Sequence, residues 1–490
     1  MARIAVIGAG MGALAAAARL AVAGHRVVVY ERTETYGGAV RRFERDGFAF
    51  DTGPGLLPLP AVWRDLFLKT GKEALESRVE LVQVDPSARH LFADGTAATL
   101  PNASRAGVVS ALDEALGARA GARWGDFLVR AREAWDRTRR PLLEEPLWPD
   151  WSVLAEREPY PAVPHKRLLR TRRAGTLAEV ADWELRDPRL AALLESHALA
   201  YGLDPRTVPA SAAVLPYMEH AFGIWYVRGG LRELARAVYE RCEARRVAFV
   251  FGAEVTRIVE KDGRAAGVEL ADGTVAEADL VLTPGGVPGA PAPGPGEVPP
   301  RRDLPSRLTV LLALRGGPEA GAAHRTVVHT GDRDGELTGL FGAAPEVPAR
   351  PTVTVLRPGD PALVPGADHE AVTVTAVVPA GARIGSDHVE AVLTAAERAV
   401  PALRERLLWQ EVRTPADVAR ETGAPGGAVP APALAAGGGA LLRPANSTAL
   451  PGLFAVGGWA HPGGGLPHAG MSGALVSGLV VEGPEFRGSQ

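Results

Sequence analysis

The sequence predicts an α/β protein of more than one domain that begins with a Rossmann-like unit. Three observations carry this prediction. A β-branched run, a glycine turn, an Ala/Leu-rich helix and a second β run follow one another between Arg3 and Tyr30, which is the pattern of a βαβ unit. The 490 residues are more than one domain of ordinary size contains. A hydrophobic fraction of 46% is enough for a large core.

The rest of the chain alternates between helical and strand-like stretches. Residues 106–200 are rich in Ala, Leu, Arg and Glu at helical spacing, which predicts a helical subdomain. Val247–Val281 carries short β runs separated by Asp-Gly turns. Ala290–Pro300 is a Pro/Gly linker. Four apolar β runs then predict a second sheet, at Leu308–Leu314, Thr326–His329, Thr352–Leu356 and Ala371–Val378. Helical signal returns at His388–Leu408, and a flexible Ala/Gly/Pro stretch at Thr422–Gly439 precedes a last strand and helix.

Charge and cysteine content exclude several classes of protein. The chain has 54 Lys and Arg against 57 Asp and Glu, a balance that does not indicate nucleic-acid binding. Its one cysteine, Cys242, excludes intramolecular disulfides, structural zinc clusters and CxxC redox chemistry, so no metal site is predicted. The first residues read as a strand rather than a signal peptide, so a cytoplasmic location is expected. The charge-free run between Arg443 and Glu482 contains four prolines, which favours a buried strand, loop and helix over a membrane span.

The first glycine turn predicts a dinucleotide site. Gly8-Ala9-Gly10-Met11-Gly12-Ala13 lies between a strand and a helix, the context in which a GxGxxG/A pattern is informative. Gly8 permits the sharp turn, Gly10 lets the backbone approach a pyrophosphate, and helix amides face the phosphates. Glu31 ends the second strand, where a carboxylate accepts hydrogen bonds from a ribose diol and disfavours NADP. The candidate contacts of this unit are Gly8, Gly10, Met11, Gly12, Ala13, Glu31 and Arg32.

A second glycine-rich region favours FAD over a nicotinamide cofactor. Gly37-Gly38 and then Gly47–Gly55 follow the βαβ unit. A flavin nucleotide is long, so a second place where backbone passes close to it is useful. The candidate contacts are Gly37, Gly38, Gly53, Pro54, Gly55 and Leu56. The later sequence contains no second strand-GxGxxG-helix unit, which argues against a separate NADPH site.

The C-terminal segment Gly452–Met471 predicts a third contribution to the same site. It reads as a strand, a glycine loop and the start of a helix near Pro467, whose amides would face an anion such as the N1/C2 carbonyl edge of a reduced flavin. The candidate contacts are Gly457, Gly458, Gly465, Leu466 and Pro467. His461 and His468 are either acid/base residues or polar loop and packing residues, and no catalytic residue is assigned.

These motifs resemble the phytoene desaturase family of FAD-dependent carotenoid oxidoreductases, which is related to the amine oxidases. The resemblance covers nearly the whole chain, through Gly8–Glu31, Gly37-Gly38, Gly47–Pro54, Gly223–Gly230, His324–Thr330 and Gly457–Pro467. The stretch His461–Pro467 is its most specific part, and Gly458-Trp459-Ala460 together with His468–Gly473 looks closer to the hydroxycarotenoid desaturase branch. Ala39 and Gly55 depart from the family pattern, which usually has Arg and Thr at these places.

The resemblance implies one discontinuous FAD-binding domain with an inserted substrate-binding sheet and a helical cap. The implied boundaries are 1–80, 226–300 and 440–490 for the FAD domain, 81–105 and 301–439 for the sheet domain, and 106–225 for the cap. In that arrangement Val255 lies beside the adenine and Met471 beside the flavin.

The activity implied by the resemblance is desaturation of a carotenoid or another polyene or isoprenoid. Hydride leaves an allylic C–H bond for flavin N5, and oxygen or a quinone takes the electrons. The polyene cation is strongly acidic at the neighbouring carbon, so a dedicated base is not demanded. Amine oxidation, alkene reduction and isomerisation are the alternatives on the same fold. A non-enzymatic isoprenoid carrier is disfavoured by the complete glycine set and Glu31.

Delivery of such a substrate raises the question of membrane association. One interpretation is an interfacial patch on the inner face of the cell membrane, formed by Trp124, Trp135, Trp148 and Trp151 with Lys166, Arg167, Arg170, Arg172 and Arg173. The other is buried tryptophans beside a solvated arginine face.

Overall fold

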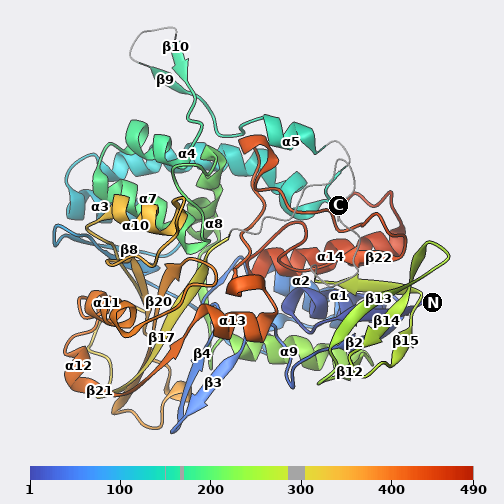
Figure 1. Cartoon of the computed structure of the whole chain (residues 1–490). Helices are drawn as coiled ribbons and strands as arrows, with labels where there is room; N and C mark the ends of the chain where they lie inside the picture. The colour runs from blue at the N-terminus through green and yellow to red at the C-terminus, as the bar shows by residue number, and fades with distance from the viewer. Residues whose placement is uncertain (149–150, 166–169, 285–303, 489–490) are drawn as a thin grey trace.

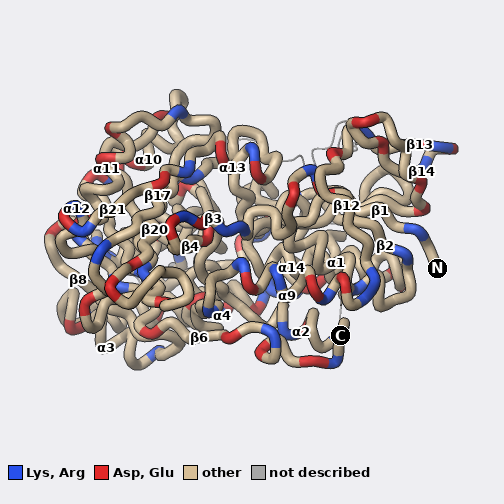
Figure 2. Tube along the Cα trace, turned by 90° about the horizontal axis from the view of Figure 1, so that it is seen from below, with Lys and Arg blue, Asp and Glu red and all other residues tan. Residues whose placement is uncertain are grey.

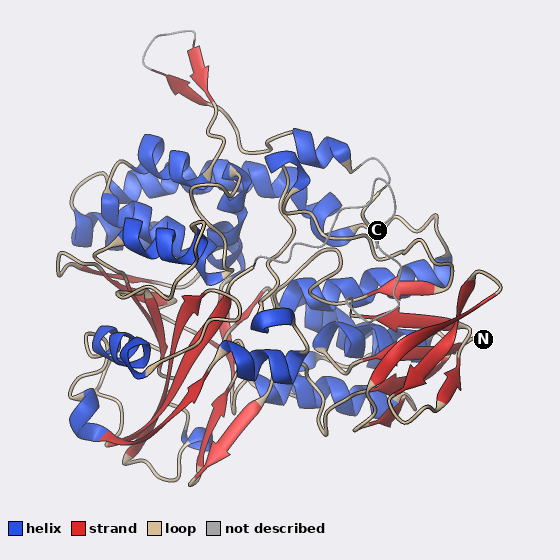
Figure 3. Cartoon of the chain, viewed as in Figure 1, coloured by secondary structure: helices blue, strands red, loops and turns tan. Residues whose placement is uncertain are grey.

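The N-terminal sequence forms the βαβ unit that its pattern predicts. The computed structural model describes residues 1–148, 151–165, 170–284 and 304–488, so the expected linker at Ala290–Pro300 lies outside the described residues. β1 (Arg3–Ile7) and β2 (Arg26–Tyr30) pair in parallel, and α1 (Met11–Val22) connects them. The predicted fold class, an α/β protein with several sheets, is confirmed (Figures 1 and 3).

β1 is the central strand of a five-stranded parallel sheet built from distant parts of the chain. The strand order is β12-β2-β1-β16-β22, with β12 at Ala248–Val250, β16 at Leu280–Thr283 and β22 at Leu453–Ala455. Ile4 and Val6 pack in the same apolar cluster as α1, α9 (Leu231–Ala244) and α14 (Leu466–Glu482). Ala5 and Ile7 pack on the opposite face. Because both faces are buried, β1 reads as an unbroken apolar run.

The second face of this sheet is covered by a small antiparallel sheet. It consists of β13 (Val255–Lys261), β14 (Arg264–Leu270) and β15 (Val275–Glu277). Both turns expected at Asp-Gly pairs are present, and Asp262, Gly263 and Gly273 have positive φ angles of 53°, 71° and 84°. The preference of Asp and Gly for this backbone region explains why the sequence marks both hairpins.

The second predicted sheet is present and has seven strands. Its order is β21-β17-β20-β19-β18-β7-β8, with β21 at Leu407–Arg413, β17 at Ser306–Arg315, β20 at His369–Val378, β19 at Val353–Leu356, β18 at Arg325–Val328, β7 at Ala88–Leu91 and β8 at Ala97–Leu100. One face packs on α11 (Ser386–Ala396), and the other on the hairpin of β3 (Arg42–Arg45) and β4 (Phe48–Asp51). The helix expected over His388–Leu408 is too long, because the chain breaks after α11, forms a single turn α12 (Leu403–Arg406) and enters β21.

Residues 105–222 are mostly helical, and their helices stand above the seven-stranded sheet in Figure 1. They are α3 (Arg105–Leu116), α4 (Ala120–Arg139), the π-helical turn η2 (Arg140–Glu144), α5 (Ser152–Glu156), α6 (Leu177–Val180), the π-helical turn η3 (Ala181–Leu185), α7 (Pro188–Ala200) and α8 (Val214–Phe222). The helical prediction for 106–200 is confirmed except at β9 (Val163–His165) and β10 (Arg170–Arg172). These two strands form a hairpin that projects from the helices (Figure 1).

Shorter elements complete the chain around these layers. They are α2 (Ala61–Gly71), a three-stranded sheet of β5 (Leu57–Pro58), β11 (Ile224–Val227) and β6 (Leu81–Gln83), α10 (Arg333–Phe341) and α13 (Pro415–Thr422), with 3-10 turns at Leu75–Ser77, Ala210–Ala213, Pro361–Leu363, Pro425–Gly427 and Gly437–Gly439.

The stretch Thr422–Gly439, expected to be flexible, is instead largely packed. Ala431, Leu434 and Ala435 are at most 1% exposed. A side chain at Gly427 would overlap the carbonyl of Pro415. The small residues that suggested flexibility therefore serve close packing of backbone against backbone.

The tryptophan patch considered for membrane binding does not form as one surface. Trp124 and Trp135 are 4% and 6% exposed and lie in the helical core. Trp148 stacks under the guanidinium of Arg487. Lys166 and Arg167 lie outside the described residues. Acidic and basic residues are interspersed along the trace (Figure 2), and none of the helices in the described ranges combines the length and apolar character needed to cross a membrane.

Candidate active site

The first glycine turn holds the start of α1 against the end of β2. Gly8 has a φ of +81°, and its N–H donates to the carbonyl of Tyr30 at 2.7 Å. The N–H of Gly37 donates to the carbonyl of Ala9 at 2.8 Å, and Gly37 forms a β-bridge with Gly10. The two glycine turns predicted separately therefore lie side by side at the N-terminus of α1.

Glu31 is buried beside this turn, where a ribose would be expected. Its side chain is bound on both oxygens, because Oε2 accepts the N–H of Ala9 at 2.7 Å and Oε1 accepts the N–H and the hydroxyl of Thr33 at 2.9 and 2.8 Å. An ionised carboxylate accepts about four hydrogen bonds. The three bonds present leave capacity for a ribose hydroxyl, while they fix the carboxylate in place.

Replacing Glu31 by alanine is expected to weaken FAD binding by roughly 10- to 100-fold. Hydrogen bonds to a charged group contribute about 1.5–3 kcal/mol, and each 1.4 kcal/mol is tenfold in affinity. Fluorescence titration of the apoprotein with FAD measures the change. Glu34→Ala is the matched control, because Glu34 is an exposed carboxylate of the same loop. Equal affinity of Glu31→Ala and wild type would show that the ribose assignment is wrong.

The C-terminal loop contacts the first turn of α1. A Cβ on Gly12 would lie 2.8 Å from both the Cα of Gly457 and the carbonyl oxygen of Ala469. One turn further along α14, a Cβ on Gly473 would lie 2.6 Å from the carbonyl oxygen of Gly12. Glycine at these positions lets α1 and α14 run side by side (Figure 1), which brings the N-terminal and C-terminal candidate residues together.

Two polar residues that the sequence reading missed support this C-terminal loop. The hydroxyl of Ser472 accepts the N–H of Gly457 at 2.9 Å. The buried amide nitrogen of Asn446 donates to the carbonyls of Ala455 and His461 and to Ser472. Asn446 carries no motif signal, and the motif stretch His468–Gly473 does not reveal what Ser472 does, because the role of each depends on contacts between segments that are apart in sequence.

The second glycine stretch links the cofactor region to α9. Asp51 accepts the N–H groups of Leu231 and Arg232 at 2.7 and 3.1 Å, and thus caps this helix. Burial raises the pKa of Asp51 to about 6, although both amide donors act in the opposite direction. A side chain at Gly53 would overlap the carbonyl of Ala39, so the backbone at Gly53 is in direct contact with the backbone at Ala39.

The other candidate residues lie in α1, near the end of β2, at the start of β13 and in the later glycine-rich segments. Met11 and Ala13 are buried in α1. Arg32 is exposed and donates to the carbonyl of Arg420. Val255 begins β13, two residues after Ala253, whose N–H donates to the carbonyl of Glu31. The remaining candidates Gly38, Pro54, Gly55, Leu56, Gly458, Gly465, Leu466, Pro467 and Met471 lie in the second glycine stretch, the C-terminal loop and the first two turns of α14, and Leu56 packs near β11.

The residues present fit an FAD. A Cβ added at Gly10 or at Gly457 would meet no atom within 4 Å, whereas the neighbouring Gly12 is tightly packed. Open space in front of two glycine backbones, beside the N-termini of α1 and α14, is the cradle that a pyrophosphate and an electron-rich flavin edge require. Gly10, Glu31 and Gly457 would hold the cofactor, which supplies a two-electron acceptor at this site.

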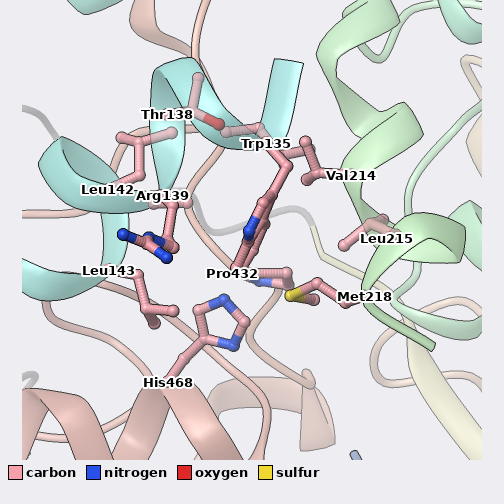
Figure 4. Close-up of a pocket in the computed structure, with 12 residues that line it drawn as sticks. Trp135, Thr138, Arg139, Leu142, Leu143, Val214, Leu215, Met218, Pro432 and His468 are labelled. Carbon is pink, nitrogen blue, oxygen red and sulfur yellow. The ribbon is translucent and has the colours of Figure 1, made fainter. Parts of the chain in front are cut away.

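An apolar cavity ends at the first turn of α14 (Figure 4). It is lined by Trp135, Thr138, Arg139, Leu142, Leu143, Val214, Leu215, Met218, Pro432, Ala433, Leu434 and His468. These residues come from α4, η2, α8, the packed stretch after Gly427, and α14. Eight of the twelve side chains are hydrocarbon or thioether in character and a ninth is the indole of Trp135, so the cavity suits an apolar ligand.

The two candidate histidines differ in their surroundings. Both are buried, and burial lowers the pKa of each to about 4, so both rings are neutral at pH 7. Nε2 of His461 lies 2.9 Å from the carbonyl of Glu145, to which it donates. Nδ1 of His461 and Nδ1 of His468 both lack a hydrogen-bond partner in the described part of the chain, and only His468 lines the cavity.

Comparisons with known proteins agree with this geometry. A family model described as flavin containing amine oxidoreductase matches residues 14–302. The chain is 30% identical to the hydroxyneurosporene desaturase of Rhodobacter capsulatus over 96% of both chains. It is 29% identical to the 4,4'-diapolycopene oxygenase of Methylomonas sp over 98% of both.

A solved structure supports the fold alone. The oxidoreductase from Methanosarcina mazei superposes with a TM-score of 0.64 at 19% identity, covering 97% of this chain and 99% of that one. The family model covers more than half of the chain, and the cradle formed by Gly10, Glu31 and Gly457 fits the cofactor. The chain is an FAD-dependent oxidoreductase and belongs to the flavin-containing amine oxidoreductase family.

Proposed function

We propose that this enzyme desaturates a carotenoid or another polyene or isoprenoid substrate. Similarity over nearly the full length to a hydroxyneurosporene desaturase and a diapolycopene oxygenase supports this substrate class. The observation that carries the proposal is the apolar cavity that ends beside the first turn of α14, where the flavin candidates Leu466, Pro467 and Met471 lie.

The cavity must widen to accept a polyene. Its free volume of about 20 Å³ is the space of roughly one water molecule. Met218 lines it, and an unbranched thioether side chain adapts readily to a new neighbour. Arg139 also lines the cavity and keeps half of its side chain exposed, so the substrate would enter the cavity at this residue.

Gly10, Glu31 and Gly457 would hold an FAD, which would supply a two-electron acceptor for a hydride from an allylic carbon, and the chain itself would position the substrate and exclude water. We propose oxygen or a quinone as the acceptor of the electrons, because the sequence contains no second strand-GxGxxG-helix unit that would bind a nicotinamide cofactor. The segments 1–80, 226–300 and 440–490 form the cofactor domain in this proposal. The seven-stranded sheet, from 81–105 and 301–439, and the helices of 106–225 enclose the substrate.

Peripheral membrane association is a further part of the proposal. Val153 on α5 is 58% exposed, and the hairpin β9–β10 projects nearby (Figure 1). Arg173 is exposed and donates to the carbonyl of Glu158, two residues after α5 ends, and an exposed aliphatic side chain together with such a basic residue suits an anionic interface. Flotation with anionic liposomes is expected to carry the wild-type protein upward and to carry less of a Val153→Asp variant. Absence of any co-migration would contradict this part of the proposal.

Anaerobic mixing tests the reaction itself. The holoenzyme is mixed with an acyclic polyene in detergent micelles, and loss of the oxidised-flavin absorbance is followed together with the product spectrum. The expected result is flavin bleaching with a product that absorbs at longer wavelength, because each added double bond extends conjugation. Putrescine serves as the comparison substrate. Bleaching by the amine without bleaching by the polyene would overturn the proposed function.

A further inference from the structure

His468 is the one strongly polar, fully enclosed side chain on the wall of an otherwise apolar cavity. The other lining residues with polar side-chain atoms are Trp135, which has an indole N–H, Thr138, whose hydroxyl already donates to the carbonyl of Ala134, and Arg139, which is half-exposed and paired with Glu144. His468 is 6% exposed, and its ring points into the cavity towards Trp135 (Figure 4). A buried ring nitrogen without a partner costs stability. His461 has such a nitrogen too, but only the ring of His468 lies on the cavity wall, where a ligand could reach it.

His468 lies in the helix turn that directly follows the C-terminal glycine loop. It occupies the first turn of α14, between Pro467 and Met471, and a Cβ added at Gly465 would lie 3.4 Å from its Nδ1. Gly457, which faces open space in the cofactor cradle, belongs to the loop that leads into the same helix. A ligand in the cavity would therefore touch His468 at the end nearest the cofactor.

We propose that His468 is a catalytic residue whose imidazole takes the proton that the substrate loses as its new double bond forms. The inference rests on the proposed function and adds a named proton acceptor to it. Burial keeps the ring neutral, since it lowers the pKa to about 4, so a lone pair is available at pH 7. A weak base suffices, because a carbon next to a polyene cation is strongly acidic.

Atoms and electrons balance in this step. The C–H bond on one allylic carbon breaks, and its electron pair leaves as hydride to the FAD. The C–H bond on the adjacent carbon breaks, its electron pair becomes the new π bond, and its proton goes to the free ring nitrogen of His468. The substrate loses two electrons and the FAD gains two. The proton and the hydride then leave together for the quinone or oxygen, which restores the neutral ring.

The experiment compares His468→Leu with His461→Leu in the FAD-loaded protein. His461→Leu removes a hydrogen bond to Glu145, so it is expected to lower the melting temperature. His468→Leu removes a buried nitrogen that has no partner, so its melting temperature and FAD content are expected to equal or exceed those of wild type. Its rate of flavin reduction by the polyene is nevertheless expected to fall about 100-fold, the usual contribution of a general base.

Chemical rescue separates a proton acceptor from a packing residue. Added imidazole is expected to restore a substantial part of the rate of flavin reduction in His468→Ala, and to leave wild type unchanged. A rate of flavin reduction in His468→Leu equal to that of wild type would overturn the inference. So would a fall in melting temperature as large as that of His461→Leu, or failure of imidazole to rescue His468→Ala. If the wild-type enzyme does not reduce its flavin with any polyene, the proposed function itself fails, and that result is distinct from these.

Discussion

Replacing Gly10 by alanine is expected to weaken FAD binding by about 10- to 100-fold while the apoprotein remains as stable as wild type. Gly10 has ordinary extended angles, φ −71° and ψ 162°, so alanine adopts them without strain. Its Cβ would meet no protein atom within 4 Å. That space is where the pyrophosphate belongs, and an extra methyl group in a tightly packed site costs about 1–3 kcal/mol.

Gly12→Ala is the matched control, two residues away in the same turn. Its Cβ would meet the backbone of Gly457 and Ala469 at 2.8 Å, so this variant is expected to lower the melting temperature of the apoprotein as well. FAD titration and thermal unfolding of the two apoproteins measure the difference. If Gly10→Ala binds FAD like wild type, the open space at Gly10 is not the pyrophosphate site. If it unfolds like Gly12→Ala, the glycine serves packing alone.

Glu370→Leu is expected to lower the free energy of unfolding by about 3–5 kcal/mol, because it breaks a buried ion pair from one side. Glu370 and Arg357 have side chains that are 1% and 2% exposed and are joined by two hydrogen bonds, at 2.6 and 3.1 Å. Arg406 donates to the same carboxylate at 2.6 Å. Without Glu370, the enclosed Arg357 keeps only the half-exposed Glu319 among these carboxylates.

Chemical denaturation of the purified protein measures this loss. The double variant Glu370→Leu with Arg357→Met is expected to recover most of the stability, since it removes both buried charges together. FAD affinity is expected to be unchanged in either variant, because the pair lies in the seven-stranded sheet, on β20 and just after β19. A single variant as stable as wild type would show that the pair is not desolvated in solution.

Local sequence signals were sufficient for the cofactor turn. Gly8 has a positive φ, which favours glycine, and the side chains of β1 are buried on both faces of the sheet, which requires an apolar run. Each requirement is visible within a few residues of sequence. The hairpins at Asp262 and Asp272 were predictable for the same reason. These features depend on backbone conformation, which neighbouring residues largely decide.

Features that depend on distant contacts were predicted poorly. The sequence left Trp124 and Trp135 open between an interfacial patch and buried positions, because a helical spacing of tryptophans does not say which face meets the core, and the structure buries both. The Ala/Gly/Pro stretch before Gly439 looked flexible but is packed, since small residues serve tight contact as well as disorder. Asn446 supports the C-terminal loop through segments nine to 26 residues away, and no local pattern announces this.

The strand order of the parallel sheet has a consequence for how the protein is made. β1 pairs with β16, which begins about 280 residues later, and β16 pairs with β22, which begins at residue 453. At roughly 5–20 residues per second of synthesis, one edge of β1 stays unpaired for on the order of tens of seconds. An apolar strand with a free edge is a template for aggregation during that time. Chaperone supply, more than mature stability, is therefore expected to limit the yield of this enzyme on overexpression.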